Sequence, residues 1–248
     1  MNNTAYLEML SKRSSFTRDE LHSEMNDCGF IVGEALFKVK LQALISANKI
    51  IRVGRNAYCV PREGIKKYQH EYSELAEGIA EKIIKTHPYL RFMIFETIQL
   101  NEFINHQIAH NVVFVSVEDV LGDFVFDTLK GAYSGRILNN PTIKIFHQYW
   151  YSDMIVIRKL VTEAPVDRNC LWATKLEKFL VDIIADPLLL DSVSETEYPA
   201  IFEGAFQKYA VDESCLFRYA KRRGNDKNIL QLIGNETNIL LKTRERKC

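Results

Sequence analysis

The sequence predicts an α+β fold with two differently built parts. Over residues 1–65, three helical patterns precede a short β-hairpin pattern. From residue 89 to 248, strand and helix patterns first alternate and then give way to helices alone, which favours a mixed α/β domain with a helical C-terminal part. A long polar helical pattern over residues 62–85 ends before Pro88. We therefore expect residues 66–88 to form a helix that connects the two domains.

Each helix of the N-terminal domain carries its own start or stop signal. The first is predicted over residues 4–12. The second begins at a capping box, in which Thr17 and Glu20 each satisfy a backbone amide of the other, and Gly29 breaks it. The third spans residues 33–47. Apolar residues at helical spacing predict its buried face, which holds Phe37, Leu41, Leu44 and Ile45.

A basic β-hairpin follows these helices. Apolar residues alternate on both sides of a turn over residues 51–60, and the turn contains Gly54 and Asn56. Arg55 lies at the tip of the turn and Arg52 beside it. Three helices and a basic hairpin in this order are typical of a winged helix-turn-helix, a module whose commonest use is to read DNA.

Five residues of this module are candidates for contact with double-stranded DNA. Lys38 and Gln42 point away from the buried face of the third helix, and Lys40 points to its side. Lys and Gln have defined partners on the base edges of the major groove. Arg52 and Arg55 are placed to contact backbone phosphate or the minor groove.

The distribution of charge agrees with a nucleic-acid reader at the N-terminus. Residues 1–70 contain 11 Lys and Arg against 7 Asp and Glu, a balance of +4, and the remaining residues compensate it because the whole chain is neutral. Glu34 at the start of the third helix opposes this, since its carboxylate repels phosphate. Winged helices also serve in protein–protein contact, so an interaction module remains an alternative.

The middle of the chain alternates between strand and helix patterns. We expect strands over residues 91–95, 112–117, 136–138 and 153–158, the last continuing through 160–161, and helices over 100–106 and 119–129. Signatures of catalysis are missing from the sequence: it has no phosphate-binding loop, no glycine-rich dinucleotide turn and no nucleophile elbow.

Two patterns in this region could hold a metal ion. His106 and His110 are four residues apart, but Gln107 stands where a zinc protease needs its Glu base, and we interpret both histidines as turn or capping residues. An acidic stripe on the helix after the second strand could hold a cation, face solvent or contact a basic partner; it consists of Asp119, Asp123 and Asp127. A metal-dependent nuclease is a second alternative, although no acidic pair precedes an E-x-K-like strand. We predict no metal and no cofactor.

The C-terminal part is predicted to be helical. Thr174 and Glu177 form a second capping-box pattern that opens a helix over 174–186, which Pro187 ends. Further helices are expected over residues 198–209, 212–223 and 228–242. One of them ends in a basic cluster that could contact nucleic acid or an acidic protein, or simply face solvent; it consists of Arg218, Lys221, Arg222 and Arg223.

The sequence favours a cytoplasmic protein. Its five cysteines are scattered without metal-site spacing, and its longest apolar runs are the length of a strand. No signal-peptide pattern is evident at the N-terminus, and we expect no association with a membrane.

Two blocks resemble the AbiEi-type antitoxins of abortive-infection systems. Residues 51–61 are similar to the "rv-x-rG-x-Y-x-lP" wing of that family, with Asn56 where the family often has Gly. Residues 172–184 are similar to its "A-t-p-E-r-t-l-l-D-l-l" helix, with Glu177 and Asp182 at the acidic positions and Lys175 at the usual Pro. The order of the segments between these blocks also fits the family.

The resemblance implies a transcriptional regulator that is also an antitoxin, and not an enzyme. The winged helix would bind an inverted repeat in its own promoter, where two copies of the chain are the natural expectation. The C-terminal domain would counteract a toxin that looks like a nucleotidyltransferase. The chain lacks the Gly-Ser and Asp-x-Asp pattern that such a toxin needs to hold metal and nucleotide.

Overall fold

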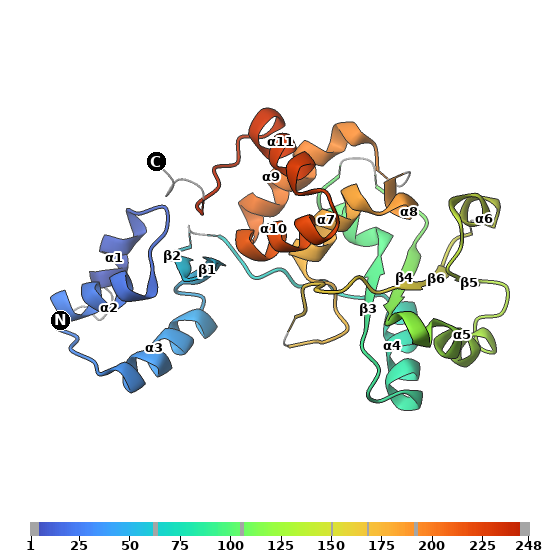
Figure 1. Ribbon diagram of the computed structural model, residues 1–248, viewed down its shortest axis with the longest axis horizontal. Helices are drawn as coiled ribbons and strands as arrows, with labels where there is room; N and C mark the ends of the chain where they lie inside the picture. The colour runs from blue at the N-terminus through green and yellow to red at the C-terminus, as the bar shows by residue number, and fades with distance from the viewer. Residues whose placement is uncertain are drawn as a thin grey trace.

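The protein is a mixed α+β structure with two small sheets, and about half of the described residues are helical (Figure 1). The computed structural model describes residues 5–61, 64–104, 107–149, 151–167, 169–190 and 193–243. The first sheet pairs β1 with β2, and the second has the order β3-β4-β6-β5.

Three helices and a hairpin form the N-terminal region. Their bounds are α1 (Ala5–Ser11), α2 (Arg18–Asp27), α3 (Glu34–Ser46), β1 (Ile51–Gly54) and β2 (Ala57–Cys59). The predicted capping box of α2 is present: the Thr17 hydroxyl accepts the Glu20 amide at 3.2 Å, and the Glu20 carboxylate accepts the Thr17 amide. Gly29 ends α2 with a φ of +85°, and Asn56 supplies the positive φ of the hairpin turn.

The hairpin is buried on both of its faces. Tyr58 on one face joins the core of the three helices, and its backbone exchanges two hydrogen bonds with Phe16 between α1 and α2. The other face packs against Ala210 of the C-terminal helical region; it consists of Ile51, Val53, Ala57 and Cys59. The hairpin therefore joins the N-terminal helices to the rest of the molecule.

A four-stranded sheet forms the centre of the second part. Its strands are β3 (Phe92–Glu96), β4 (Val112–Val117), β5 (Ile137–Asn139) and β6 (Met154–Lys159). β3 pairs antiparallel with β4, whereas β4, β6 and β5 are parallel to one another. The residues of β4 are buried on both faces, as expected for a sheet covered by helices on both sides.

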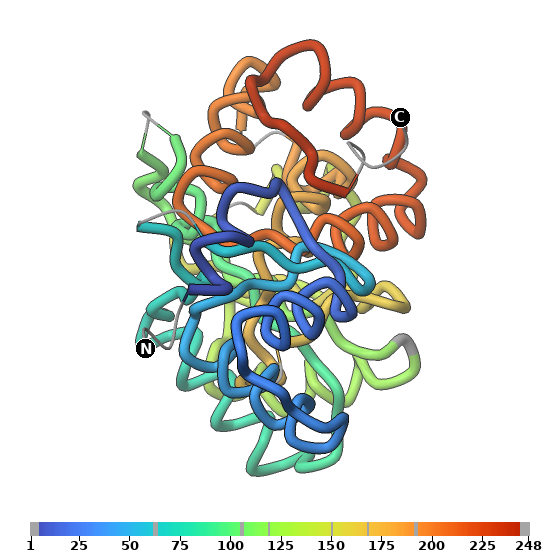
Figure 2. Tube along the Cα trace, turned by 90° about the vertical axis from the view of Figure 1, so that its left-hand side faces the viewer, coloured from blue at the N-terminus to red at the C-terminus, as the bar shows by residue number. Residues whose placement is uncertain are grey.

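Helices cover the two faces of this sheet in different numbers (Figure 1). Their bounds are α4 (Glu74–Thr86), η1 (Thr97–Glu102), η2 (Asp119–Leu121), α5 (Gly122–Lys130), α6 (Ile143–Gln148), α7 (Leu176–Ala185), α8 (Pro187–Leu190), η3 (Glu195–Glu197), α9 (Tyr198–Lys208), α10 (Glu213–Arg222) and α11 (Asp226–Glu236). Apolar residues of α4 and α5 cover one face, and those of α7, α9, α10 and α11 cover the other. After α11 the chain returns to the N-terminal helices (Figures 1 and 2).

The connecting helix predicted over residues 62–85 is wrong in its first half, because helix begins only at Glu74. The Ser73 hydroxyl accepts the Ala76 amide and caps α4 there. Before it, residues 64–73 contain no helix, and the Lys66 backbone pairs with the chain at Lys208 and Ala210. The apolar face of α4 packs into the core of the second part, so this helix is part of that domain and not a separate connector.

The second predicted capping box is also wrong. The Thr174 hydroxyl donates to the Ile94 carbonyl instead, and the N-cap of α7 is Lys175, without a side-chain hydrogen bond. Glu177 is buried and accepts the backbone amide of Asp212 at 2.9 Å. Sequence spacing alone could not reveal these partners, because they lie 80 and 35 residues away.

Several other boundaries differ from the predicted ones. The segment after β3 is a 3₁₀ helix over Thr97–Glu102, β6 ends at Lys159, and the last helix ends at Glu236. The short helix Ile143–Gln148 has no counterpart in the sequence prediction. Among the described helices, none combines the length and the apolar content that crossing a membrane requires.

Candidate nucleic-acid interface

One face of α3 is buried and the opposite face is exposed. Phe37 and Leu41 pack into the core of the N-terminal helices. Lys38 and Gln42 are exposed, as their spacing predicted, and Val39 between them is 64% exposed. The exposed surface of α3 thus combines an apolar side chain and an amide with a cation on one flank.

Lys40 lies apart from this exposed surface. Its ammonium lies over the ring of Phe30, a residue of the loop before α3, at 5.5 Å from the ring centroid. The side chain is half-buried. Of the three predicted residues of α3, Lys38 and Gln42 therefore lie close together. The side chain of Lys40 extends from the side of the helix toward Phe30.

Glu34, whose charge opposes phosphate binding, is paired. The Arg18 guanidinium of α2 donates to the Glu34 carboxylate and lies 5.2 Å from the centroid of the Phe37 ring. The hydrogen bond from Arg18 holds the pKa of Glu34 below its ordinary value, so the carboxylate stays ionised and compensated. The start of α3 consequently presents an ion pair in place of a single negative charge.

The tip of the hairpin rests against α10. The Arg55 amide donates to the Ser214 hydroxyl at 3.1 Å, and the Arg52 guanidinium donates to the Gly54 carbonyl at 3.0 Å. A Cβ atom on Gly54 would lie 2.7 Å from the Ser214 hydroxyl and 2.8 Å from a methyl group of Thr243. Both arginine side chains remain exposed.

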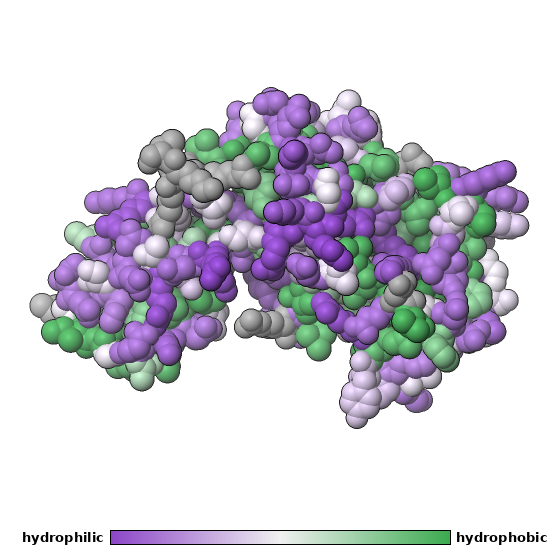
Figure 3. Space-filling view, in the orientation of Figure 1, coloured by the Kyte–Doolittle hydropathy of each residue, from purple (hydrophilic) through white to green (hydrophobic). Residues whose placement is uncertain are grey.

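This contact makes the hairpin continuous with a basic stripe on α10. Ser214, Arg218, Lys221 and Arg222 follow the i, i+4, i+7, i+8 spacing of one helix face. The last three are exposed, and Arg222 donates to the Thr162 hydroxyl at 2.7 Å. Strongly hydrophilic side chains gather over α10 and the neighbouring hairpin (Figure 3). Two basic clusters that are far apart in the sequence therefore share one surface.

Arg223, the fourth residue of the predicted cluster, turns into the protein. It donates to the Ala185 carbonyl at 2.9 Å, and its Nε lies 3.5 Å from the Asp182 carboxylate. Burial alone would raise the pKa of Asp182, but the positive charges of Lys178, Arg158 and Arg223 hold it below its ordinary value. This buried charge cluster joins α7, α10 and β6.

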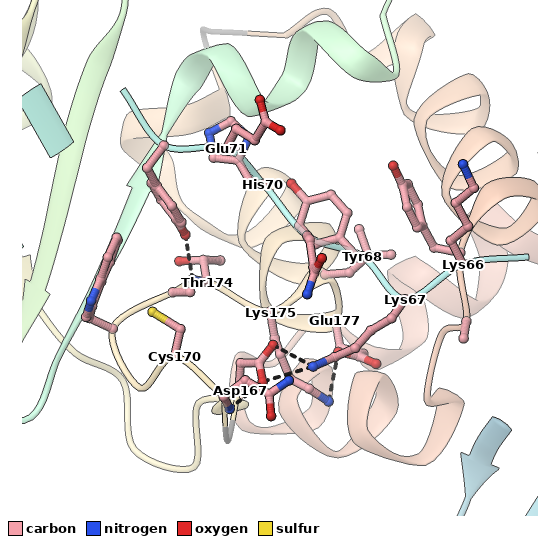
Figure 4. A pocket seen from close by; sticks show the side chains of 18 of the residues that line it. Lys66, Lys67, Tyr68, His70, Glu71, Asp167, Cys170, Thr174, Lys175 and Glu177 are labelled. Carbon is pink, nitrogen blue, oxygen red and sulfur yellow. Dashed lines mark hydrogen bonds and ion pairs between the residues drawn. The ribbon is translucent and has the colours of Figure 1, made fainter. Parts of the chain in front are cut away.

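A cavity of about 670 Å³ lies beside the segment that precedes α4 (Figure 4). Sequence reasoning missed it, because its walls come from separate segments, namely residues 66–72, 77, 167, 169–170, 172–177 and 209–210. Lys67 pairs with Asp167 at 3.1 Å and Lys175 with Glu177 at 3.3 Å. These lysines are neutralised within the cavity wall, so they add no uncompensated positive charge for an anionic ligand.

The candidate metal ligands are dispersed. In the described ranges, no group of three or more His, Cys, Asp or Glu side chains could hold a metal ion. His106 of the histidine pair lies outside the described residues. Within the acidic stripe, Asp123 accepts from Asn139 and Asp127 pairs with Lys130, whereas the side chain of Asp119 is not described.

Comparisons with known proteins give a family but no named relative. The model of a family of unknown function, DUF6577, matches residues 36–239. No curated protein matches the chain. A crystal structure of the RV2827C protein from Mycobacterium tuberculosis is similar over 94% of this chain and 81% of that one, with 10% sequence identity and a TM-score of 0.26. Similarity at this TM-score carries no conclusion about fold or function.

Proposed function

The chain belongs to the DUF6577 family of unknown function, and we propose that it is a DNA-binding transcriptional regulator that represses its own operon. In this proposal the N-terminal region is a winged helix-turn-helix, with α3 as the recognition helix and the β1–β2 hairpin as the wing. The order α1, α2, α3 and hairpin supports it, as does the backbone pairing of Phe16 with Tyr58, an isolated antiparallel bridge beside the hairpin.

The observation that carries the proposal is the contact between the hairpin and α10. It joins Arg52 and Arg55 to the stripe of Arg218, Lys221 and Arg222 through the hydrogen bond from the Arg55 amide to Ser214. A surface with this many exposed cations suits a polyanion, and each cation that meets a phosphate adds to the salt dependence of binding. In this arrangement α3 enters the major groove and the hairpin and α10 contact the backbone.

The proposal extends to the partners that the sequence predicts. Two copies of the chain bind an inverted repeat, because one winged helix reads only a short half-site. The remainder of the chain counteracts a nucleotidyltransferase-like toxin, as the resemblance to AbiEi-type antitoxins implies. The regulator acts in the cytoplasm, and the free thiols of the four described cysteines support that location.

A second candidate function is protein–protein contact through the N-terminal region. Apolar side chains are exposed on and beside α3: Ile31 is 87% exposed, Leu36 53% and Val39 64%. Exposed apolar side chains that gather on one face are typical of surfaces that bind other proteins. A measurement of DNA binding separates this candidate function from the transcriptional regulator.

The test is fluorescence anisotropy with DNA from the region upstream of the gene. Scrambled DNA of the same length, a salt series and the Arg55→Ala variant accompany it. Arg136→Ala serves as the matched control, because Arg136 is an exposed arginine before β5, on the other part of the molecule. We expect the chain to bind the upstream DNA more tightly than the scrambled DNA, and its affinity to fall steeply as the salt concentration rises. Arg55→Ala should reduce the affinity, whereas Arg136→Ala should leave it unchanged.

The outcomes distinguish the three functions that the sequence leaves open. Absence of any preference for upstream DNA, or an Arg55→Ala variant that binds like the parent, contradicts the regulator and favours the interaction module. Cleavage of the same DNA when Mg²⁺ is added would instead identify the metal-dependent nuclease. A regulator leaves the DNA intact.

A further inference from the structure

The centre of the exposed face of α3 is built from small or apolar side chains and one amide. Ala35, Val39, Gln42 and Ser46 follow one another along the helix, opposite the buried Phe37 and Leu41. All four are exposed. Between Ala35 and Gln42 the helix rises about 10 Å, which is the length of about three base pairs.

The cations of α3 lie on the flanks of this face. Lys38 lies nearer the buried side, and Lys40 is held over Phe30. The carboxylate of Glu34 is occupied by Arg18. The central face is consequently free of net charge, and its flank and the hairpin carry positive charge, as expected where a helix contacts base edges and its surroundings contact phosphate.

The chemistry of this face matches one kind of base pair. Each A·T pair presents an adenine N7 acceptor, an adenine N6 donor and a thymine methyl group in the major groove. A Gln amide can bond both adenine groups at once, and apolar side chains contact the thymine methyl. A G·C pair lacks the methyl group, and its guanine is met best by Arg or Lys.

We propose that α3 recognises A·T base pairs, with Gln42 on an adenine and the methyl groups of Ala35 and Val39 against thymine methyl groups. This assignment rests on the proposed function and names its specificity. Contact with a methyl group also gives the exposed, apolar Val39 at the centre of this face a partner.

The test begins with selection of duplexes from a random pool by the full-length chain at fixed salt. Each thymine of the selected site is then replaced by uracil, which removes only the methyl group. We expect the selected site to contain consecutive A·T pairs. At one or two positions uracil should weaken binding about fourfold, the factor that corresponds to ~0.8 kcal/mol for a methyl-sized apolar contact.

Three variants assign the effect to α3. Val39→Ala should remove the difference between thymine and uracil at one position, and Gln42→Ala should reduce the preference for adenine at a neighbouring position about tenfold or more. Val120→Ala is the matched control, because Val120 is a valine that is 84% exposed on the other part of the chain. All three positions are exposed, and melting temperatures confirm that each variant is folded.

The uracil and variant measurements can contradict the recognition of A·T pairs without contradicting DNA binding. Salt-sensitive binding without any effect of uracil, or with an effect that Val39→Ala leaves unchanged, overturns the assignment of A·T pairs and preserves DNA binding. Binding of no duplex at any salt concentration overturns both. If the α3 variants alter neither affinity nor preference, the exposed face of α3 does not contact bases and the assignment is overturned.

Discussion

Neighbouring residues of one predicted cluster have opposite surroundings in the structure. Lys221 is exposed on α10, whereas Arg223, two residues further, bonds the Ala185 carbonyl and faces Asp182. The basic composition of this helix end does not distinguish the two, because a basic run there satisfies the helix dipole in either case. The difference arises from helical periodicity, since Arg223 keeps the αR conformation and follows the buried Tyr219 by four residues.

This difference predicts separate consequences for two substitutions. Lys221→Ala should leave the free energy of unfolding within about 0.5 kcal/mol of the parent and lower the slope of log affinity for DNA against log salt by about 0.9. Arg223→Ala should instead lower the free energy of unfolding by about 2–4 kcal/mol, since it leaves Asp182 buried beside one fewer positive charge. Urea unfolding and anisotropy measure the two effects. Equal effects of both variants on DNA binding alone would contradict this assignment.

Gly54 provides a second prediction at the scale of one residue. The Cβ atom of Gly54→Ala would lie 2.7 Å from the Ser214 hydroxyl and 2.8 Å from Thr243. Relieving this overlap requires the side chains of Ser214 and Thr243 to turn away or the hairpin to shift, which disturbs the hydrogen bond from the Arg55 amide to Ser214, and we expect the free energy of unfolding to fall by about 1–3 kcal/mol. Gly234→Ala in α11 is the control, because its Cβ meets nothing within 4 Å and should stabilise the helix by about 0.5–1 kcal/mol. Calorimetry of both variants tests the pair.

At the scale of elements, a buried carboxylate contributes to the attachment of the segment before α4 to the sheet. Glu96 at the end of β3 is inaccessible to solvent and accepts hydrogen bonds from His70, Ser73 and Asn111. Burial alone would raise the pKa of Glu96, but these donors outweigh it and hold the pKa below its ordinary value. The ionised form therefore stabilises the fold.

This pKa shift predicts an acid-dependent loss of stability. The contribution of Glu96 is complete above its ordinary pKa of 4.5 and disappears as the pH falls through the lowered value of the folded state. Glu96→Gln should therefore cost about 1–3 kcal/mol at neutral pH, and the difference from the parent should shrink below about pH 4. Glu81→Gln on the exposed side of α4 is the control. A difference that stays constant from pH 7 to about pH 3 would contradict this role for Glu96.

Local signals account for the elements that the sequence predicts well. The capping box at Thr17, the break at Gly29 and the periodic apolar face of α3 all act within a few residues, and the structure confirms each one. The prediction of a helix before α4 is wrong because the spacing of Tyr68 and Tyr72 fits a helix as well as an extended chain. The true partners of the two tyrosines, Gln99 and the Ile94 carbonyl, lie more than 20 residues away.

At the scale of the whole molecule, the candidate site depends on a contact that no local pattern contains. The exposed residues of α3 follow from helical periodicity, and the structure agrees with them. The proximity of the hairpin to α10 does not, because Arg55 and Ser214 are separated by 159 residues. The two basic clusters could be found in the sequence, but their union on one surface could not.

Lys242 and Thr243 contribute to the surroundings of the hairpin. The buried Glu213 carboxylate accepts the amides of Lys242 and Thr243, and the Lys242 ammonium lies 3.3 Å from the Cys59 sulfur. During synthesis, the hairpin leaves the ribosome about 180 residues before these partners, a delay of roughly 10 to 40 seconds at ordinary elongation rates. Its apolar face also waits for Ala210, which is made about 150 residues after the hairpin; this face consists of Ile51, Val53, Ala57 and Cys59. The N-terminal region therefore acquires its contacts with Lys242 only after about 180 further residues have been translated.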